Sequence, residues 1–193
     1  MTEIHSLAVF CGSRVGIDPV FAETGRIVGT GLARLGIRLV YGGGRIGIMG
    51  VIADATLAAG GKVLGVIPQF LTQMEVAHQG ATEMVVTDSM HVRKTRLYEE
   101  ADAFLILPGG LGTFDEAFEI ITWKQLRLHD KPILVCNAGG WAEPLIALVD
   151  HVIAQGFADP KCRELFEVVE NAEAVVERLK TLPAGTGGPA DRF

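Results

Sequence analysis

The fold is decided by residues 103–126, which read AFLILPGGLGTFDEAFEIITWKQL. The run Ala103–Leu107 is short and apolar, and it is closed by a proline and two glycines at 108–110. From Phe114 to Leu126 the apolar residues instead recur with helical spacing. A strand buried on both faces, a glycine turn and a helix in this order are the repeating unit of an α/β sheet with parallel strands.

The same unit recurs along the chain. Short apolar runs that end near Gly, Pro, Ser or Asp predict strands at Leu7–Cys11, Ile37–Tyr41, Lys62–Ile67, Met84–Thr87 and Pro132–Cys136. Helical spacing predicts helices at Phe21–Leu35, Met49–Ala59, Met90–Glu100 and Ala142–Ala154. This alternation predicts a doubly wound, mostly parallel, Rossmann-like sheet with helices on both faces. Ligands of such sheets bind beyond the carboxyl ends of the strands, so the candidate functional residues follow the strands.

Length and composition favour one domain. The chain has 193 residues, of which 49% are hydrophobic, enough to bury a sizeable core. We expect a single nucleotide-binding catalytic domain over 1–182 and a flexible tail over 183–193, where small residues lack apolar periodicity. One longer connection, Pro68–Thr82, carries Glu75 and His78, and connections of this length at a ligand-facing edge are often binding loops.

Charge and cysteine usage exclude several classes of function. A net charge of -6 with scattered Lys and Arg argues against a nucleic-acid or anionic-membrane surface. We find no signal-peptide pattern and no apolar segment of membrane-spanning length, so we expect a cytoplasmic protein. Neither a disulfide framework nor a metal site is indicated, and we expect no metal and no cofactor, given the spacing of Cys11, Cys136, Cys162, His5, His78, His91, His129 and His151.

Three of the expected strands end in glycine. Gly12 and Ser13 follow the first strand, Gly43 and Gly44 the second, and residues 108–113 the fifth. Backbone N–H groups at such turns bind anions, and glycine lets a phosphate approach without a Cβ in the way. One glycine turn alone is usually structural, but three at one sheet edge predict a nucleotide phosphate site. Since Ser13 is not part of a Gly-x-Ser-x-Gly elbow, a serine nucleophile has little support.

The second glycine turn also matches a dinucleotide pattern. Residues 42–47 satisfy G-x-G-x-x-G between a strand and a helix. That motif requires an acidic residue about twenty positions on to hold the ribose, and Lys62–Pro68 contains no carboxylate. No loop ends in the Gly-Lys-Ser/Thr of a triphosphate site. A redox dinucleotide is therefore the weaker hypothesis, and a nucleoside triphosphate is not indicated.

Thr113 and Glu116 allow two interpretations. Their spacing is that of a capping box, in which both side chains bond the first N–H groups of a helix. Alternatively, the helix start binds a phosphate and the Glu116 carboxylate faces the sugar. There the carboxylate would stabilise the positive charge of an oxocarbenium-like transition state. The spacing alone favours neither.

Arg93 and Lys94 stand at the start of another expected helix. Adjacent cations there oppose the helix dipole, which indicates an anionic ligand or a carboxylate partner nearby. The alternative is that one of the two is simply solvated. Arg93 cannot lend a proton at neutral pH, and Lys94 could do so only with a lowered pKa.

Together these residues resemble the LONELY GUY family, whose members are cytokinin riboside 5′-monophosphate phosphoribohydrolases. The resemblance runs from about Leu7 to Leu179 and rests on Cys11-Gly12-Ser13, Tyr41-Gly42-Gly43-Gly44, Gly47, Met49-Gly50, Met90-His91, Arg93-Lys94 and Pro108-Gly109-Gly110-x-Gly112-Thr113-x-x-Glu116. This chain has Phe114-Asp115 where many members have Leu-Glu. Family members have also been labelled lysine decarboxylases, but nothing marks the Schiff-base lysine or the acidic partner of a pyridoxal enzyme.

The resemblance implies hydrolysis of a nucleoside 5′-monophosphate to a free purine base and ribose 5-phosphate, without a cofactor. It implies catalytic roles for Glu116, at the sugar cation or the attacking water, and for Arg93, near the leaving base. It implies substrate-binding roles for Glu75, Lys94, Gly110, Leu111, Gly112, Thr113, Phe114, Asp115 and Thr122. It also implies a homodimer or larger homo-oligomer with sites at the subunit interface, near Thr122 and Trp123.

Two alternatives remain open. One is a general nucleosidase for AMP or other monophosphates in salvage, and the other is a nucleotide-binding carrier without catalysis. The presence of both Arg93 and Glu116 argues against the carrier. The sequence does not decide the preferred base or choose between a dimer and a hexamer.

Overall fold

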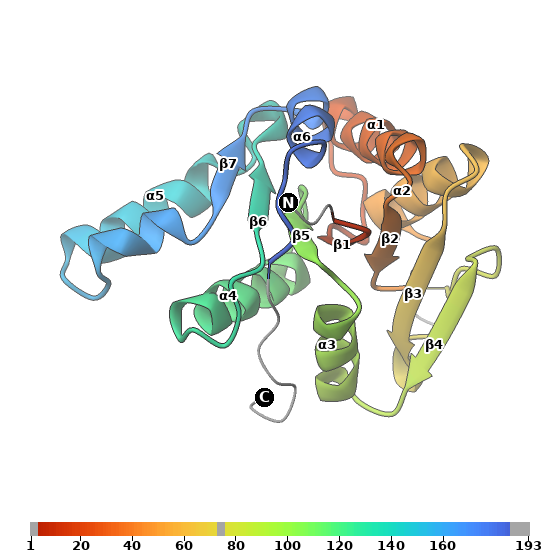
Figure 1. The fold of residues 1–193 in the computed structure, drawn as a ribbon, viewed down its shortest axis with the longest axis horizontal. Helices are drawn as coiled ribbons and strands as arrows, with labels where there is room; N and C mark the ends of the chain where they lie inside the picture. The colour runs from red at the N-terminus through yellow and green to blue at the C-terminus, as the bar shows by residue number, and fades with distance from the viewer. Residues whose placement is uncertain (1–3, 73–75, 186–193) are drawn as a thin grey trace.

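The computed structural model describes residues 4–72 and 76–185, and in this part seven strands form one parallel sheet (Figure 1). The strand order is β4-β3-β2-β1-β5-β6-β7. The strands are β1 (Ser6–Phe10), β2 (Arg38–Tyr41), β3 (Val63–Pro68), β4 (Glu83–Thr87), β5 (Ala103–Ile106), β6 (Ile133–Cys136) and β7 (Glu167–Val169). The chain first winds from β1 towards β4 and then crosses to β5 on the other side of β1, which confirms the doubly wound sheet.

Helices cover both faces of the sheet. They are α1 (Pro19–Leu35), α2 (Gly47–Ala58), α3 (Met90–Glu99), α4 (Leu111–Gln125), α5 (Glu143–Ala154) and α6 (Ala172–Leu179). One core cluster joins the sheet to α1, α2 and α6, and the other joins it to α3, α4 and α5 (Figure 1). All strands and helices predicted from the sequence form, with boundaries within three residues of the prediction.

The alternation of side chains in β1 explains its unbroken apolar sequence. Leu7 and Val9 belong to the core under α1 and α2, whereas Ala8 and Phe10 belong to the core under α4. Successive side chains of a strand point to opposite faces, and here both faces are buried.

The last strand and helix, β7 and α6, were not predicted. β7 has three residues at the sheet edge, two of them exposed, so it carries no apolar run. α6 is short, and its start is capped by Asn171, whose side chain accepts a hydrogen bond from the N–H of Ala174 at 2.9 Å. Short edge elements are held by tertiary contacts rather than by a pattern that can be recognised locally.

The connection from β3 to β4 contains no α-helix among its described residues. It begins with a 3-10 turn at Gln69–Leu71, and Ala77 then forms an antiparallel bridge with Gly44 after β2. Most of the expected tail, 186–193, lies outside the described residues, while Ala184 packs against the core. No helix in the described ranges is both long and apolar enough to cross a membrane.

Candidate active site at the start of α4

The loops that follow β1 and β5 lie side by side at the point where the strand order reverses. Phe10 pairs with Ile106 in the sheet, and just beyond them the N–H of Gly12 donates to the carbonyl of Pro108 at 3.0 Å. A Cβ on Gly12 would crowd the backbone of Arg14 and Gly109. The close approach of the two loops therefore requires glycine, and it puts the first and third glycine turns together.

Helix α4 begins at Leu111, three residues before the predicted start. Its N-cap is Gly110, which makes no side-chain cap hydrogen bond, and the carbonyl of Gly110 accepts from the N–H of Phe114 at 3.1 Å. Thr113 is thus inside the first turn, so the capping-box interpretation of Thr113 and Glu116 is wrong. The N–H groups of Leu111, Gly112 and Thr113 precede the first helical hydrogen bond and are the donors that an anion binds at a helix start.

Glu116 faces Arg93 instead of the helix start. Nη1 of Arg93 lies 3.3 Å from Oε1 of Glu116, and the two side chains are only 7% and 11% exposed. Nε of Arg93 also donates to the carbonyl of Val66 at 3.1 Å. A Cβ on Gly42 would collide with the guanidinium, so the glycine after β2 leaves the space that Arg93 fills. Two strands, β2 and β3, and two helices, α3 and α4, therefore position this ion pair.

The ion pair borders a small cavity of about 160 Å³. The start of α4 forms one wall, and the loop after β1 and the start of α2 form the other. Its lining residues are Cys11, Gly12, Ser13, Met49, Arg93, Gly110, Leu111, Gly112, Thr113 and Glu116. Backbone N–H groups, one carboxylate and one guanidinium thus converge on one space. Met49 and Cys11 were noted in the sequence only as part of the resemblance.

Lys94 has carboxylate partners on α4. Its Nζ lies 2.8 Å from Asp115 and 3.4 Å from Glu119. Burial lowers the pKa of Lys94, but these two ion pairs outweigh burial and the net pKa is raised, so the lysine stays protonated at neutral pH. Both Arg93 and Lys94 therefore have carboxylate partners, as the cations at the start of α3 predicted, and simple solvation of either is excluded.

The structure does not bring every candidate residue to this cavity. Gly43 packs against β3 and β4, and Gly44 pairs with Ala77. Lys94 and Asp115 pair on the outer side of α4. Neither this cavity nor the larger one described next is lined by Gly43, Gly44, Lys94, Phe114, Asp115 or Thr122. Glu75 lies outside the described residues.

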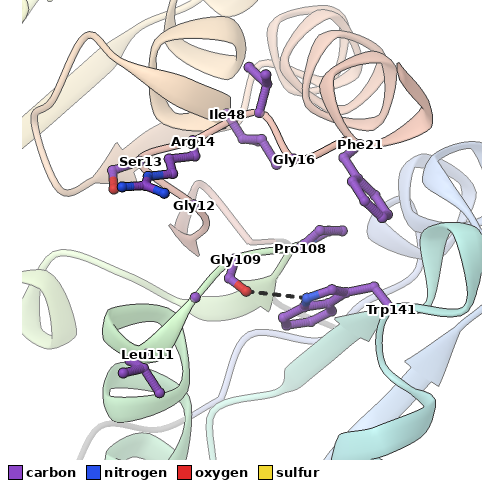
Figure 2. A pocket seen from close by; sticks show the side chains of 12 residues that line it. Gly12, Ser13, Arg14, Gly16, Phe21, Ile48, Pro108, Gly109, Leu111 and Trp141 are labelled. Carbon is purple, nitrogen blue, oxygen red and sulfur yellow. Dashed lines mark hydrogen bonds between the residues drawn. The ribbon is translucent and has the colours of Figure 1, made fainter. Parts of the chain in front are cut away.

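A second and larger cavity, of about 560 Å³, adjoins the first (Figure 2). Its walls include Phe21 at the start of α1 and Trp141 after β6, neither of which was singled out from the sequence. The Trp141 Nε1–H donates to the carbonyl of Gly109 at 3.2 Å, and its ring stacks on Phe114 with centroids 5.3 Å apart. The position of Trp141 in the connection between β6 and α5, beyond the carboxyl end of a strand, was the only signal that could have identified it.

No cluster of three or more His, Cys, Asp and Glu side chains suited to a metal occurs within 4–72 and 76–185. The cysteines of this part, Cys11, Cys136 and Cys162, form no disulfide.

Comparison with known proteins gives the family. A model described as "Possible lysine decarboxylase" matches residues 49–179. A cytokinin riboside 5′-monophosphate phosphoribohydrolase of Rhodococcoides fascians is 40% identical over 177 residues, covering 91% of this chain and 89% of the relative. A probable enzyme of the same name from Oryza sativa subsp. japonica is 41% identical over 174 residues, covering 90% of this chain and 78% of the relative. The chain belongs to the LONELY GUY phosphoribohydrolase family.

Solved structures agree with this family's fold. A molybdenum cofactor binding protein from Rippkaea orientalis superimposes with a TM-score of 0.71 at 19% identity, covering 94% of this chain and 98% of the other. A molybdenum cofactor carrier protein from Chlamydomonas reinhardtii has a TM-score of 0.69 at 18% identity, covering 91% of this chain and 96% of the other. At this identity the likeness shows only a shared Rossmann-like architecture.

The lysine decarboxylase label of the LONELY GUY family model finds no support in this site. No lysine lines either of the two cavities described above. Lys94 is held by Asp115 and Glu119, with a raised pKa that opposes Schiff-base formation. The site instead offers the buried carboxylate of Glu116 beside the start of α4.

Proposed function

We propose that this protein hydrolyses the N-glycosidic bond of adenosine 5′-monophosphates, including N6-substituted ones, and releases the free base and ribose 5-phosphate. The observation that carries the proposal is the buried Arg93–Glu116 ion pair at the border of a cavity formed by the start of α4. The names of relatives about 40% identical over nine tenths of the chain support the same reaction.

The phosphate would lie at the start of α4. The N–H groups of Leu111, Gly112 and Thr113 and the positive end of the helix dipole favour an anion there. Gly110 and Gly112 have open space where a Cβ would stand, so an oxygen can approach the backbone closely. A monophosphate held here brings its ribose toward Glu116, one turn further along the same helix.

Glu116 would then act on the anomeric carbon. As the C–N bond breaks, the sugar ring gains positive charge, which the carboxylate stabilises most strongly in the transition state. The water oxygen bonds to the anomeric carbon, and one proton of that water ends on the departing base. Arg93 holds the carboxylate in place, but it supplies no proton itself.

We also propose that two copies associate through the outer face of α4. Leu111, Phe118 and Leu126 are 87%, 37% and 63% exposed on that face, and Thr122 lies among them, also exposed. Three exposed large apolar side chains on one helix face favour a contact with another protein surface. Cys11 and Cys136 form no disulfide, which suits the reducing cytoplasm where we place the protein.

The test is a chromatographic assay for free base. The protein is incubated with AMP and, separately, with isopentenyladenosine monophosphate, and the two corresponding ribosides serve as controls. We expect release from the monophosphates alone, since the helix start recognises the phosphate. The ratio of the two rates decides between hormone activation and general salvage, and binding of AMP without release would favour the carrier function.

A further inference from the structure

The larger cavity near α4 is not explained by the proposed reaction. It is lined by the loop after β1, the start of α1, the residues between β5 and α4, and Trp141 (Figure 2). Arg93 and Glu116 do not line it. Its volume of about 560 Å³ is that of a site for a complete organic ligand. We call it the α1 chamber.

The two ends of the α1 chamber differ in chemistry. Figure 2 shows Ser13 and Arg14 at one end, and Phe21 and Trp141 at the other. Arg14 is exposed, and it forms no ion pair with any residue that the structure describes. The hydrogen bond to Gly109 and the stacking on Phe114 hold the indole of Trp141 rigidly. One end therefore suits an anion and the other suits a planar apolar ring.

The α1 chamber meets the small cavity beside the Arg93–Glu116 pair, here called the catalytic cavity, at the proposed phosphate position. Both are lined by Gly12, Ser13, Gly110 and Leu111. The catalytic cavity continues along α4 to Glu116, whereas the chamber continues back along the loop before α4 to Pro108. A nucleotide with its anomeric carbon at Glu116 has its base beyond the sugar, so the chamber faces the other side of the phosphate.

We propose that the α1 chamber binds the second half of a dinucleoside 5′,5′-pyrophosphate. The first phosphate lies at the start of α4, which rests on the proposed function. The second phosphate lies beside Arg14, and the second base lies against Trp141 and Phe21. The protein thus recognises dinucleotides as ligands more strongly than nucleoside monophosphates, although the acidic ribose ligand of a redox Rossmann site is missing after β3.

The test is a series of three ligands: AMP, ADP and diadenosine pyrophosphate. Their affinities are measured by calorimetry on the Glu116→Gln protein, in which turnover does not interfere. ADP adds the second phosphate, and the dinucleotide adds the second base. We expect ADP to bind several-fold more tightly than AMP, and the dinucleotide to bind on the order of tenfold more tightly again, as for one base stacked on an aromatic side chain.

Two further substitutions, each combined with Glu116→Gln, assign these gains. Arg14→Ala should abolish the gain from AMP to ADP. Val15→Trp should fill the chamber and abolish the gain from ADP to the dinucleotide, while AMP affinity stays unchanged, because Val15 lines only the chamber. Ile17→Trp is the matched control, since Ile17 is fully exposed and lines neither cavity.

Equal affinity for AMP and the dinucleotide would overturn the proposal. A loss of AMP affinity in the Val15→Trp protein would also overturn it and would assign the chamber to the substrate base. Release of base from AMP by the wild-type protein is measured separately. Failure of that assay removes the proposed hydrolysis but leaves the dinucleotide affinities to decide the chamber.

Discussion

Glu116 gains its proposed role from a residue that is distant in sequence. At the start of a helix it would only cap backbone groups, but here the helix begins earlier and the carboxylate turns to Arg93 at 3.3 Å. Arg93 in turn is fixed by the Val66 carbonyl and by the space above Gly42. A buried carboxylate placed in this way stabilises a neighbouring positive charge more strongly than one in water.

Glu116→Gln tests this role directly. The amide keeps the shape of the side chain but loses the charge, so AMP affinity should stay near that of the wild type while kcat falls by about 10²- to 10³-fold. Steady-state kinetics and calorimetry with AMP measure the two quantities. A folded Glu116→Gln protein with full turnover would remove the carboxylate from the mechanism. An Arg93→Ala protein should likewise bind but be nearly inactive.

Lys131 provides a pH-dependent contribution to stability away from the site. It is 6% exposed, and its Nζ donates to the carbonyl of Tyr98 at 2.7 Å. Burial lowers its pKa from 10.5 to about 8, against the smaller opposing effect of Asp102. Between these two pKa values the unfolded chain holds a proton that the folded chain has lost, so this group makes the protein more stable as pH rises.

We therefore compare wild-type and Lys131→Met proteins between pH 8 and 10.5, the range set by the two pKa values of Lys131. The free energy of unfolding should rise more steeply with pH in the wild type than in the Lys131→Met protein, because only the wild type carries the titrating lysine. Urea titrations at several pH values measure the difference. Lys62→Met, at an exposed lysine, is the control and should follow the wild type. Parallel curves for wild type and Lys131→Met would refute the assigned protonation change.

At the scale of the element, α4 connects the anion site to the carboxylate. Its first turn carries the N–H donors, its second carries Glu116, and its outer face carries the exposed apolar side chains. The glycines at its start let a ligand approach the backbone. No unusual backbone angle requires them, because neither Gly110 nor Gly112 has a positive φ. A methyl group at Gly112 would therefore fit the helix and obstruct only the ligand.

Gly112→Ala should separate stability from binding. Alanine in a helix is favoured over glycine, so the free energy of unfolding should stay the same or rise by up to about 1 kcal/mol. AMP affinity should fall roughly tenfold or more, as for the loss of a charge-assisted hydrogen bond. Thermal unfolding measures the stability, and calorimetry measures the affinity for AMP. Adenosine, which lacks the phosphate, should compete with AMP as weakly in the variant as in the wild type. Unaltered AMP affinity would place the phosphate elsewhere.

At the scale of the whole molecule, the strand order reverses between β1 and β5, and the candidate site lies beyond the carboxyl ends of these two strands. The two cavities meet there, with α3 and α4 on one side and α1 and α2 on the other. The outer face of α4 is turned away from this core and carries Phe118 and Leu126. The proposed dimer contact would therefore lie on the side of α4 that faces away from the sheet.

Phe118→Glu should convert the proposed dimer into a monomer. A charge at the centre of an apolar contact costs far more than at a free surface, so the sedimentation coefficient should fall to that of one chain. The circular dichroism spectrum should stay the same, because Phe118 is partly exposed already. Phe157→Glu, at an exposed aromatic residue after α5, is the control. A wild-type protein that sediments as a monomer would contradict the assembly.

Local sequence determined the strand and helix units and the glycine turns of this protein, because buried strands and amphipathic helices leave periodic patterns within a few residues. It also identified Arg93, Glu116 and the glycines around Gly110 as candidates. Only the tertiary structure decided that the helix starts at Leu111, that Arg93 meets Glu116, and that Phe21 and Trp141 face one chamber. These contacts join residues far apart in sequence, and their geometry depends on how helices pack across the sheet, which no local pattern encodes.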